Sequence, residues 1–124
     1  MYEVTVAKIF CAAHAIRLPD GSPEPIHGHN WETRITVGSN RLNPIEVVMD
    51  FHDLERLVDT IVTQANNRNL NDIGPFADDR LNPTAERVAW WLGTEVAKGL
   101  PAGVDLVCAC VREAPGCWAT FRPN

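Results

Sequence analysis

Two segments near the start of the chain alternate between apolar and polar residues, with the period of two that is typical of half-buried β-strands. In residues 2–14 the apolar side chains share one parity (Tyr2, Val4, Val6 and Phe10). In residues 29–38 one parity holds Trp31, Thr33, Ile35 and Val37, of which only Thr33 is polar. The segment between them, residues 17–28, holds three prolines and two glycines and is predicted to be a loop. A turn at residues 38–40 and a short strand at residues 47–49 are predicted next.

Helical spacing replaces this alternation in the middle of the chain. One apolar set is spaced by three and four positions (Leu54, Leu57, Val58, Ile61, Val62 and Ala65), and a second set follows later (Val88, Ala89, Leu92 and Val96). Asp50 and Thr84 are the expected N-caps, because their side-chain oxygens can accept hydrogen bonds from free backbone N–H groups. Gly99 and Pro101 are expected to end the second helix. Residues 66–82, rich in Asn, Asp, Pro and Gly, are predicted to be a loop.

The last part of the chain returns to strand patterns at residues 106–111 and 117–121, with a turn predicted at residues 113–116. The resulting order, β-β-α-α-β-β, contains no repeat of solenoid length and cannot alternate as βαβ units. We therefore expect one α+β domain over residues 1–124, with a four-stranded antiparallel sheet covered on one face by two antiparallel helices. Because such a sheet has two open edges, we also expect a homo-oligomer.

The composition and net charge argue against some classes of binding partner. Of the 124 residues, 45% are hydrophobic and 22% are charged, as in ordinary globular proteins. The formal net charge of −5 argues against nucleic acid or an anionic membrane surface, because phosphate binding needs a basic face. No apolar run is long enough to span a bilayer.

The cysteines indicate a compartment. The chain has four, Cys11, Cys108, Cys110 and Cys117; they form no C-x-x-C pair, and three lie in apolar, strand-like runs. We interpret them as buried free thiols in a reducing environment. The chain also opens directly into a strand pattern rather than a leader sequence. These features together predict a cytoplasmic protein.

The strongest chemical signal is the run His27-Gly28-His29. On an extended backbone, residues i and i+2 point to the same side, so both imidazoles can reach one ion. His14 ends the first predicted strand and would lie beside this pair if the two strands form a hairpin. Three neutral imidazoles leave a fourth position open, which is the arrangement of a catalytic zinc site. The alternative is two surface histidines in a turn. The remaining histidine, His52, is predicted to be a cap or surface residue.

Five motifs, in order along the chain, resemble the 6-pyruvoyl-tetrahydropterin synthase / 6-carboxy-tetrahydropterin synthase family. They are F-C-A-A-H at residues 10–14, H-G-H-N at 27–30, V-M-D-F at 48–51, P-T-A-E at 83–86 and R-E-A-P at 112–115. The resemblance implies the T-fold (tunnelling fold), in which the sheets of several subunits join into a barrel. It also implies a trimer or hexamer with active sites between subunits.

The same resemblance implies a function. Zinc at His14, His27 and His29 would bind the side chain of a dihydropterin, such as dihydroneopterin or its triphosphate, for a lyase-type reaction. Glu113 takes the place of a glutamate that anchors the pterin ring, and a carboxylate can accept two parallel N–H bonds from the edge of that ring. Without the resemblance, Glu113 would be read as a solvated turn residue.

Two sites depart from the family pattern. The catalytic cysteine of the synthases lies four residues before the first histidine of H-G-H, and Pro23 occupies that position here. The family's L-D-H-x-x-L-N loop aligns with residues 65–71, so Asn66 and Asn67 replace an Asp-His pair that transfers protons. Asparagine does not titrate near neutral pH. Since general acid–base catalysis contributes on the order of 10²–10⁴-fold per group, little ordinary synthase activity is expected. Asn66 and Asn67 are predicted to bind or orient substrate instead.

Glu24 precedes His27 by three residues, giving E-x-x-H-G-H. A branch of the family with this spacing uses a glutamate in place of the cysteine. Those members cleave dihydroneopterin by a retro-aldol step into 6-hydroxymethyl-dihydropterin and glycolaldehyde. Glu24 is therefore the candidate catalytic base, and the alternative is an exposed loop acid between two prolines.

Three functional hypotheses follow. The first is a zinc-dependent lyase acting on a dihydropterin side chain. The second is a non-catalytic zinc homologue that binds a pterin or purine and has lost the cysteine and the Asp-His pair. The third is altered chemistry on a related heterocycle, oriented by Asn66 and Asn67.

Overall fold

The computed structural model describes all 124 residues and contains one mixed sheet, two α-helices and two short 3-10 helices. The elements, in chain order, are β1 (Tyr2–His14), β2 (His27–Ser39), α1 (Phe51–Val62), β3 (Arg68–Asn69), η1 (Leu70–Asp72), η2 (Gly74–Asp79), α2 (Ala85–Lys98), β4 (Asp105–Ala114) and β5 (Cys117–Phe121).

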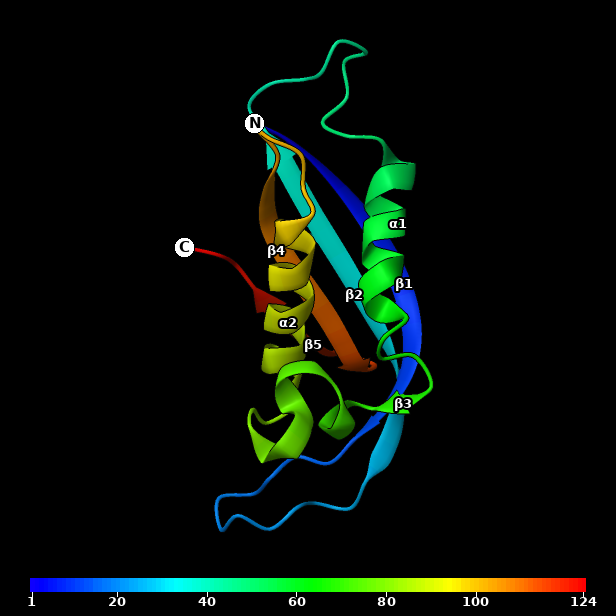
Figure 1. The fold of residues 1–124 in the computed structure, drawn as a ribbon, viewed down its shortest axis with the longest axis vertical. Helices are drawn as coiled ribbons and strands as arrows, with labels where there is room; N and C mark the ends of the chain where they lie inside the picture. The colour runs from blue at the N-terminus through cyan, green and yellow to red at the C-terminus, as the bar shows by residue number, and fades with distance from the viewer.

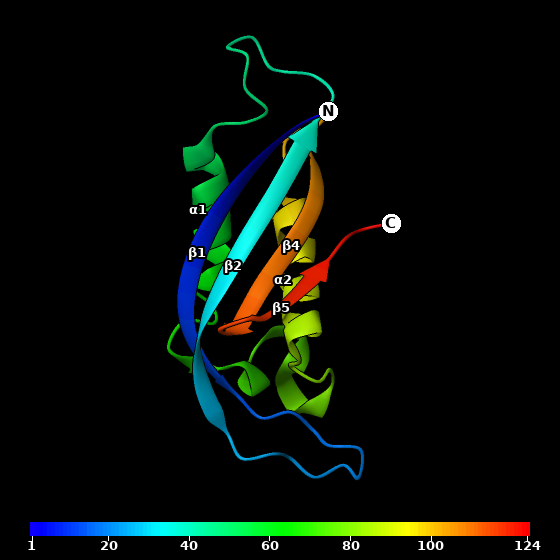
Figure 2. The same ribbon diagram turned by 180° about the vertical axis from the view of Figure 1, so that it is seen from behind.

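The sheet has the strand order β3-β1-β2-β4-β5. Both α-helices cover one of its faces, and the opposite face carries no helix (Figures 1 and 2). The predicted α+β class and the four long antiparallel strands are confirmed. The structure differs from the predicted four-stranded sheet by one additional strand, β3. This strand has two residues and pairs in parallel with the outer edge of β1. Two residues are too few to show alternation, so no sequence pattern marks this strand.

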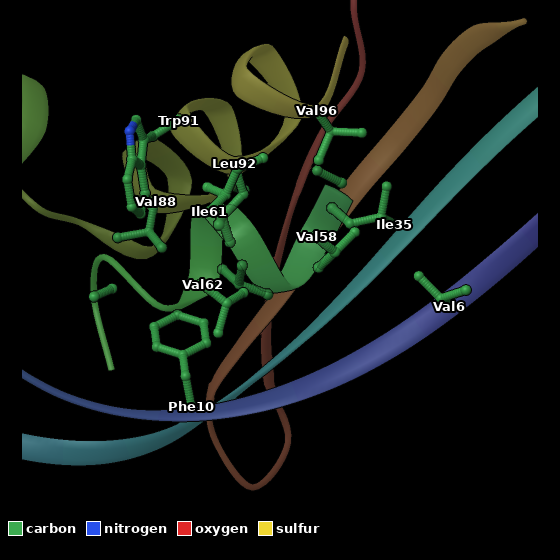
Figure 3. Packing of buried hydrophobic residues seen from close by; sticks show 14 of the residues in the cluster. Val6, Phe10, Ile35, Val58, Ile61, Val62, Val88, Trp91, Leu92 and Val96 are labelled. Carbon is green, nitrogen blue, oxygen red and sulfur yellow. The ribbon is translucent and has the colours of Figure 1, made fainter. Parts of the chain in front are cut away.

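The core lies between the sheet and the helices (Figure 3). On β2 the parity predicted to face inward is fully buried, with Trp31, Thr33, Ile35 and Val37 all at 0% exposure. The helices contribute the predicted apolar stripes, including Leu54 and Val58 from α1 and Leu92 and Val96 from α2 (among the buried residues of each helix). The period of each apolar pattern therefore predicted correctly which face of each helix and strand is buried.

The predicted helix ends are confirmed. The Asp50 side chain accepts a hydrogen bond from the backbone N–H of His52 at 2.7 Å. The Thr84 side chain accepts one from the backbone N–H of Arg87 at 3.2 Å. Gly99 is the C-cap of α2. Both N-caps satisfy backbone donors that a helix leaves free in its first turn.

Three local predictions were wrong. Residues 47–49 form no strand. In this segment between β2 and α1, the side chain of Asn43 accepts a hydrogen bond from the backbone N–H of Val47 at 3.2 Å. Residues 66–82 are not simply a loop, because η1 and η2 bury Leu70 and Phe76 in the core. β4 continues to Ala114, so the predicted turn at residues 113–116 shrinks to the two residues between β4 and β5.

The cysteines are all free, as predicted, but they are not all buried. Cys108 is buried and Cys110 is half-buried, whereas Cys11 and Cys117 are exposed. Cys11 lies between Phe10 and Ala12 in the alternation of β1, so its side chain takes the outward parity. No helix is both long and apolar enough to cross a membrane.

Candidate metal centre

Three histidines meet where β1 ends and β2 begins. His14 is the last residue of β1 and lies opposite His27, and His29 lies opposite Ala12 in the same antiparallel register. The ring centroid of His14 is 4.7 Å from that of His27 and 5.3 Å from that of His29, and the centroids of His27 and His29 are 4.7 Å apart. The hairpin therefore brings the three imidazoles together as strand geometry predicts.

Backbone carbonyls orient two of these rings. Nδ1 of His14 lies 2.8 Å from the carbonyl oxygen of Pro83, and Nδ1 of His27 lies 2.9 Å from that of Pro25. A carbonyl only accepts hydrogen bonds, so each Nδ1 must be the donor and carry the proton. In the neutral ring the lone pair is then on Nε2. A carbonyl oxygen that accepts the Nδ1 proton in this way prepares a histidine to bind a metal through Nε2.

Two of the ring nitrogens that face the middle of the cluster have no hydrogen-bond partner. Nε2 of His14 and Nε2 of His29 are both buried and unpaired. Burial lowers the pKa of His29 below its usual value, and the nearby carboxylate of Glu113 opposes only part of this effect. A neutral imidazole with a buried, unpaired lone pair is a ligand for a cation. The donor set therefore fits zinc, which takes histidine nitrogen and carboxylate oxygen.

Glu113 completes a group of four potential ligands. One ligand atom from each of His14, His27, His29 and Glu113 lies within 4.8 Å of all the others. Oε1 of Glu113 is 2.8 Å from Nε2 of His14 and 3.7 Å from Nε2 of His29. Glu113 lies on β4, not in a turn, at a register irregularity between β4 and β5. Bulges of this kind re-aim side chains next to functional sites.

Glu24 is held beside the histidines. Its carboxylate accepts the backbone N–H of Ile16 at 3.0 Å, and its own N–H donates to the carbonyl oxygen of Ile16 at 2.9 Å. Oε1 of Glu24 lies 3.8 Å from Nε2 of His27. The side chain is only 26% exposed. The structure thus favours a positioned carboxylate over a freely solvated loop acid, while its catalytic role stays a prediction.

Two asparagines fix the chain that leaves β1. The Asn71 side chain accepts the N–H of Ala15 and donates to the carbonyl oxygen of Ala15, both at 2.9 Å. Asn82 does the same for Arg17, at 2.9 and 3.1 Å. Together with Glu24 they bind three consecutive backbone units directly after His14. Sequence reasoning used Asn71 only to align the loop and did not assign it a role; nothing in the local pattern marks it as a partner of Ala15.

We expect Asn71→Ala to lower the free energy of unfolding by about 1–3 kcal/mol, because two half-buried backbone groups lose their partner. Urea unfolding of the metal-free protein measures this. Asn40→Ala, at an exposed loop position, is the matched control and should change the value by less than about 0.5 kcal/mol. Equal midpoints for the two variants would contradict the structural role of Asn71.

Asn66 and Asn67 lie at the outer edge of β1. The Asn66 side chain accepts the backbone N–H of Cys11 at 3.0 Å, and the backbone N–H of Asn67 donates to the carbonyl oxygen of Cys11 at 2.6 Å. Asn67 has a φ of +60°, which asparagine tolerates better than most residues. Neither belongs to the histidine cluster. A substrate-binding role for the pair stays a prediction.

The remaining candidate positions are peripheral. The His52 side chain is 82% exposed, which agrees with a surface residue at the start of α1. Pro23 forms an isolated backbone bridge with Arg17 in the loop before β2. The larger surface cavities are lined by residues from segments 1–4, 39–51 and 102–105 and lie at the other end of the sheet. A smaller cavity of about 290 Å³ includes Glu113 in its lining and adjoins the cluster.

Comparison with known proteins identifies relatives in pterin metabolism. The model of the family described as 6-pyruvoyl tetrahydropterin synthase matches residues 3–124. A Pyrococcus furiosus protein named dihydroneopterin monophosphate aldolase is 35% identical over 97 residues, which cover 78% of this chain and 76% of that protein.

Solved structures agree with the fold. The 6-pyruvoyl tetrahydropterin synthase of Caenorhabditis elegans superposes with a TM-score of 0.80 at 22% identity, over 100% of this chain and 98% of that one. A Plasmodium vivax 6-pyruvoyltetrahydropterin synthase, a variant whose catalytic glutamate is replaced by alanine, gives 0.76 at 18% identity, over 99% and 98% of the two chains. These likenesses confirm the predicted T-fold.

Proposed function

This chain belongs to the 6-pyruvoyl tetrahydropterin synthase family, and from that premise we propose that it is a zinc-dependent lyase that cleaves the side chain of a dihydropterin by a retro-aldol reaction. One observation carries the proposal. Glu24 is tied to the backbone of Ile16, with its carboxylate 3.8 Å from a nitrogen of the three-histidine cluster. A carboxylate held beside a Lewis-acid site is the pair of groups that this cleavage needs.

His14, His27 and His29 would hold the zinc through Nε2. Zinc bound there supplies a Lewis acid that makes a hydroxyl group of the substrate more acidic. Pro83 and Pro25 keep two of the rings in the required tautomer through their carbonyl oxygens. Trp31 lies 5.0 Å from the His14 ring and forms an apolar floor that limits water on that side.

Glu24 performs the proton transfers in the proposed reaction. It accepts the proton of the hydroxyl on the second side-chain carbon, and the bond between the first and second carbons breaks. The oxygen electrons form the carbonyl of a two-carbon aldehyde, and the electron pair of the broken bond passes to the first carbon and into the pterin ring. Protonated Glu24 then returns a proton to the first carbon. Atoms and electrons balance without water or a redox partner.

Glu113 is proposed to bind the N–H groups of the pterin ring. It lines the 290 Å³ cavity next to the cluster together with Trp118 and Glu86. A carboxylate can form two parallel hydrogen bonds with the 2-amino-pyrimidinone edge. An aromatic side chain in the same lining suits a flat heterocycle.

One relative supports cleavage over the ordinary synthase reaction, and one structural neighbour shows that a glutamate can be a catalytic residue on this fold. The Pyrococcus furiosus relative is named an aldolase for dihydroneopterin monophosphate, and the Plasmodium vivax synthase has a glutamate as a catalytic residue. The present chain lacks the synthase cysteine at Pro23 and the Asp-His pair at Asn66 and Asn67. We further propose a homo-oligomer, a trimer or hexamer, since β5 and most of β1 are open sheet edges. The free cysteines support a cytoplasmic location.

Product analysis tests the proposed function. Zinc-loaded and metal-free protein are incubated with dihydroneopterin, its monophosphate and its triphosphate, and the pterins are separated by chromatography. We expect 6-hydroxymethyl-dihydropterin from at least one of the three substrates, and only with zinc. Absence of turnover above the metal-free control on all three would favour the non-catalytic alternative, a zinc protein that binds a pterin or purine.

A further inference from the structure

Glu113 belongs to two neighbouring sites. Its carboxylate is part of the cluster with the three histidines, and its side chain also lines the cavity between β4, β5 and the start of α2. It is the one residue shared by the cluster and this cavity. A side chain that reaches both places can bind the metal or form hydrogen bonds to a bound ring. One carboxylate cannot do both fully at the same time.

The contact between Glu113 and His14 is not an ordinary hydrogen bond. The two atoms are 2.8 Å apart, yet Nε2 of His14 has no hydrogen-bond partner. Nδ1 of His14 donates to Pro83, so the neutral ring carries a lone pair on Nε2. Two electron-rich atoms at this distance repel each other unless a proton or a metal ion lies between them.

The spacing suits a shared cation. Ligand atoms around a tetrahedral zinc ion, each bonded at about 2.1 Å, lie roughly 3.4 Å from one another. Oε1 of Glu113 is 2.8 Å from Nε2 of His14 and 3.7 Å from Nε2 of His29, which are values on either side of that separation. The fully buried ring of His14 cannot turn to water for a partner.

From this geometry we infer that Glu113 is the fourth zinc ligand while the site holds no substrate, and that it leaves the metal to bind the pterin ring when substrate enters. The identity of the ring rests on the function proposed above; the ligand role does not. The exchange replaces a carboxylate oxygen by a hydroxyl oxygen of the substrate. Since a negative ligand departs, the remaining site of three neutral imidazoles is a stronger Lewis acid at the moment when substrate is present.

Ring binding and zinc binding compete for one carboxylate, so each should weaken the other, and by the same factor. This antagonism is carried by Glu113. It concerns the ring alone, because hydroxyl groups on a side chain would add zinc contacts of their own.

Zinc affinity tests the ligand role directly. Competition with a chromogenic chelator is measured for wild type, Glu113→Gln and Glu86→Gln, with circular dichroism to show that all three are folded. Glu86 lines the same cavity but lies outside the cluster, so its variant is the matched control. We expect Glu113→Gln to bind zinc about 10- to 100-fold more weakly than wild type, while Glu86→Gln binds as wild type does. Equal affinities for the two variants would contradict the ligand role.

Plain pterin, which has the ring but no side chain, tests the exchange. Its binding is followed by its own fluorescence. Saturating pterin should weaken zinc binding by wild type and change the visible absorption of the cobalt-substituted protein; neither effect should occur in Glu113→Gln. An unchanged zinc affinity and cobalt spectrum in wild type, or no binding of pterin, would overturn the exchange. Neither readout involves turnover, so a failure here is distinct from the absence of lyase activity.

Discussion

Replacing His29 with alanine is expected to abolish stoichiometric zinc binding. His29 supplies a buried Nε2 without any hydrogen-bond partner, and burial holds its pKa below the usual value, so the ring is neutral and ready to bind. Loss of a residue that only forms a hydrogen bond with a ligand lowers metal affinity about 10–100-fold, and loss of a ligand should lower it at least as much. The metal-to-subunit ratio after dialysis measures the effect.

His52→Ala is the control for this variant. The His52 side chain is 82% exposed at the start of α1 and lies outside the cluster. Its replacement should leave one zinc per subunit. If the His29 and His52 variants retain equal amounts of zinc, the proposed ligand set is refuted. Circular dichroism of the metal-free proteins separates loss of zinc from loss of fold.

Glu24→Gln is expected to lower kcat by about 10²–10⁴-fold, the contribution of one general acid–base group. The glutamine side chain keeps an oxygen that can accept the N–H of Ile16, so the loop should stay in place. It cannot take up a proton near neutral pH. Zinc content should therefore remain that of wild type while turnover falls.

Glu95→Gln serves as the control for the base. Glu95 pairs with Lys98 on the surface of α2 and belongs to no part of the cluster. Its variant should turn over substrate at the rate of wild type. A Glu24→Gln protein whose kcat stays within about threefold of wild type, against the range that a base contributes, would remove Glu24 from the mechanism.

Local patterns predicted the long elements because each has one buried face. The parity of Trp31, Ile35 and Val37 alone defined the inward side of β2. The same argument placed His27 and His29 on one side of their strand, since residues i and i+2 of a strand face the same way. The expected hairpin placed His14 beside them. The resemblance to a known family strengthened the zinc prediction and added a pterin and the role of Glu113.

Long-range pairing could not be predicted in this way. The short strand β3 exists through its pairing with Ala12 and Ala13, which are more than fifty residues away. Asn71 acts on Ala15 across a similar distance, and no local period connects them. The sequence R-E-A-P-G contains turn residues and therefore predicts Glu113 in a turn. In the structure β4 continues past Glu113, because Ala114 pairs with β5.

Deuterium incorporation from solvent tests whether the side chain is cleaved and a proton is returned to its first carbon. Zinc-loaded wild-type protein is incubated in deuterium oxide with the dihydropterin substrate that it turns over best, and both products are examined by mass spectrometry. We expect 6-hydroxymethyl-dihydropterin with one deuterium on the hydroxymethyl carbon and one equivalent of a two-carbon aldehyde, because the protonated Glu24 exchanges with solvent. A pterin product that retains all three side-chain carbons would contradict it.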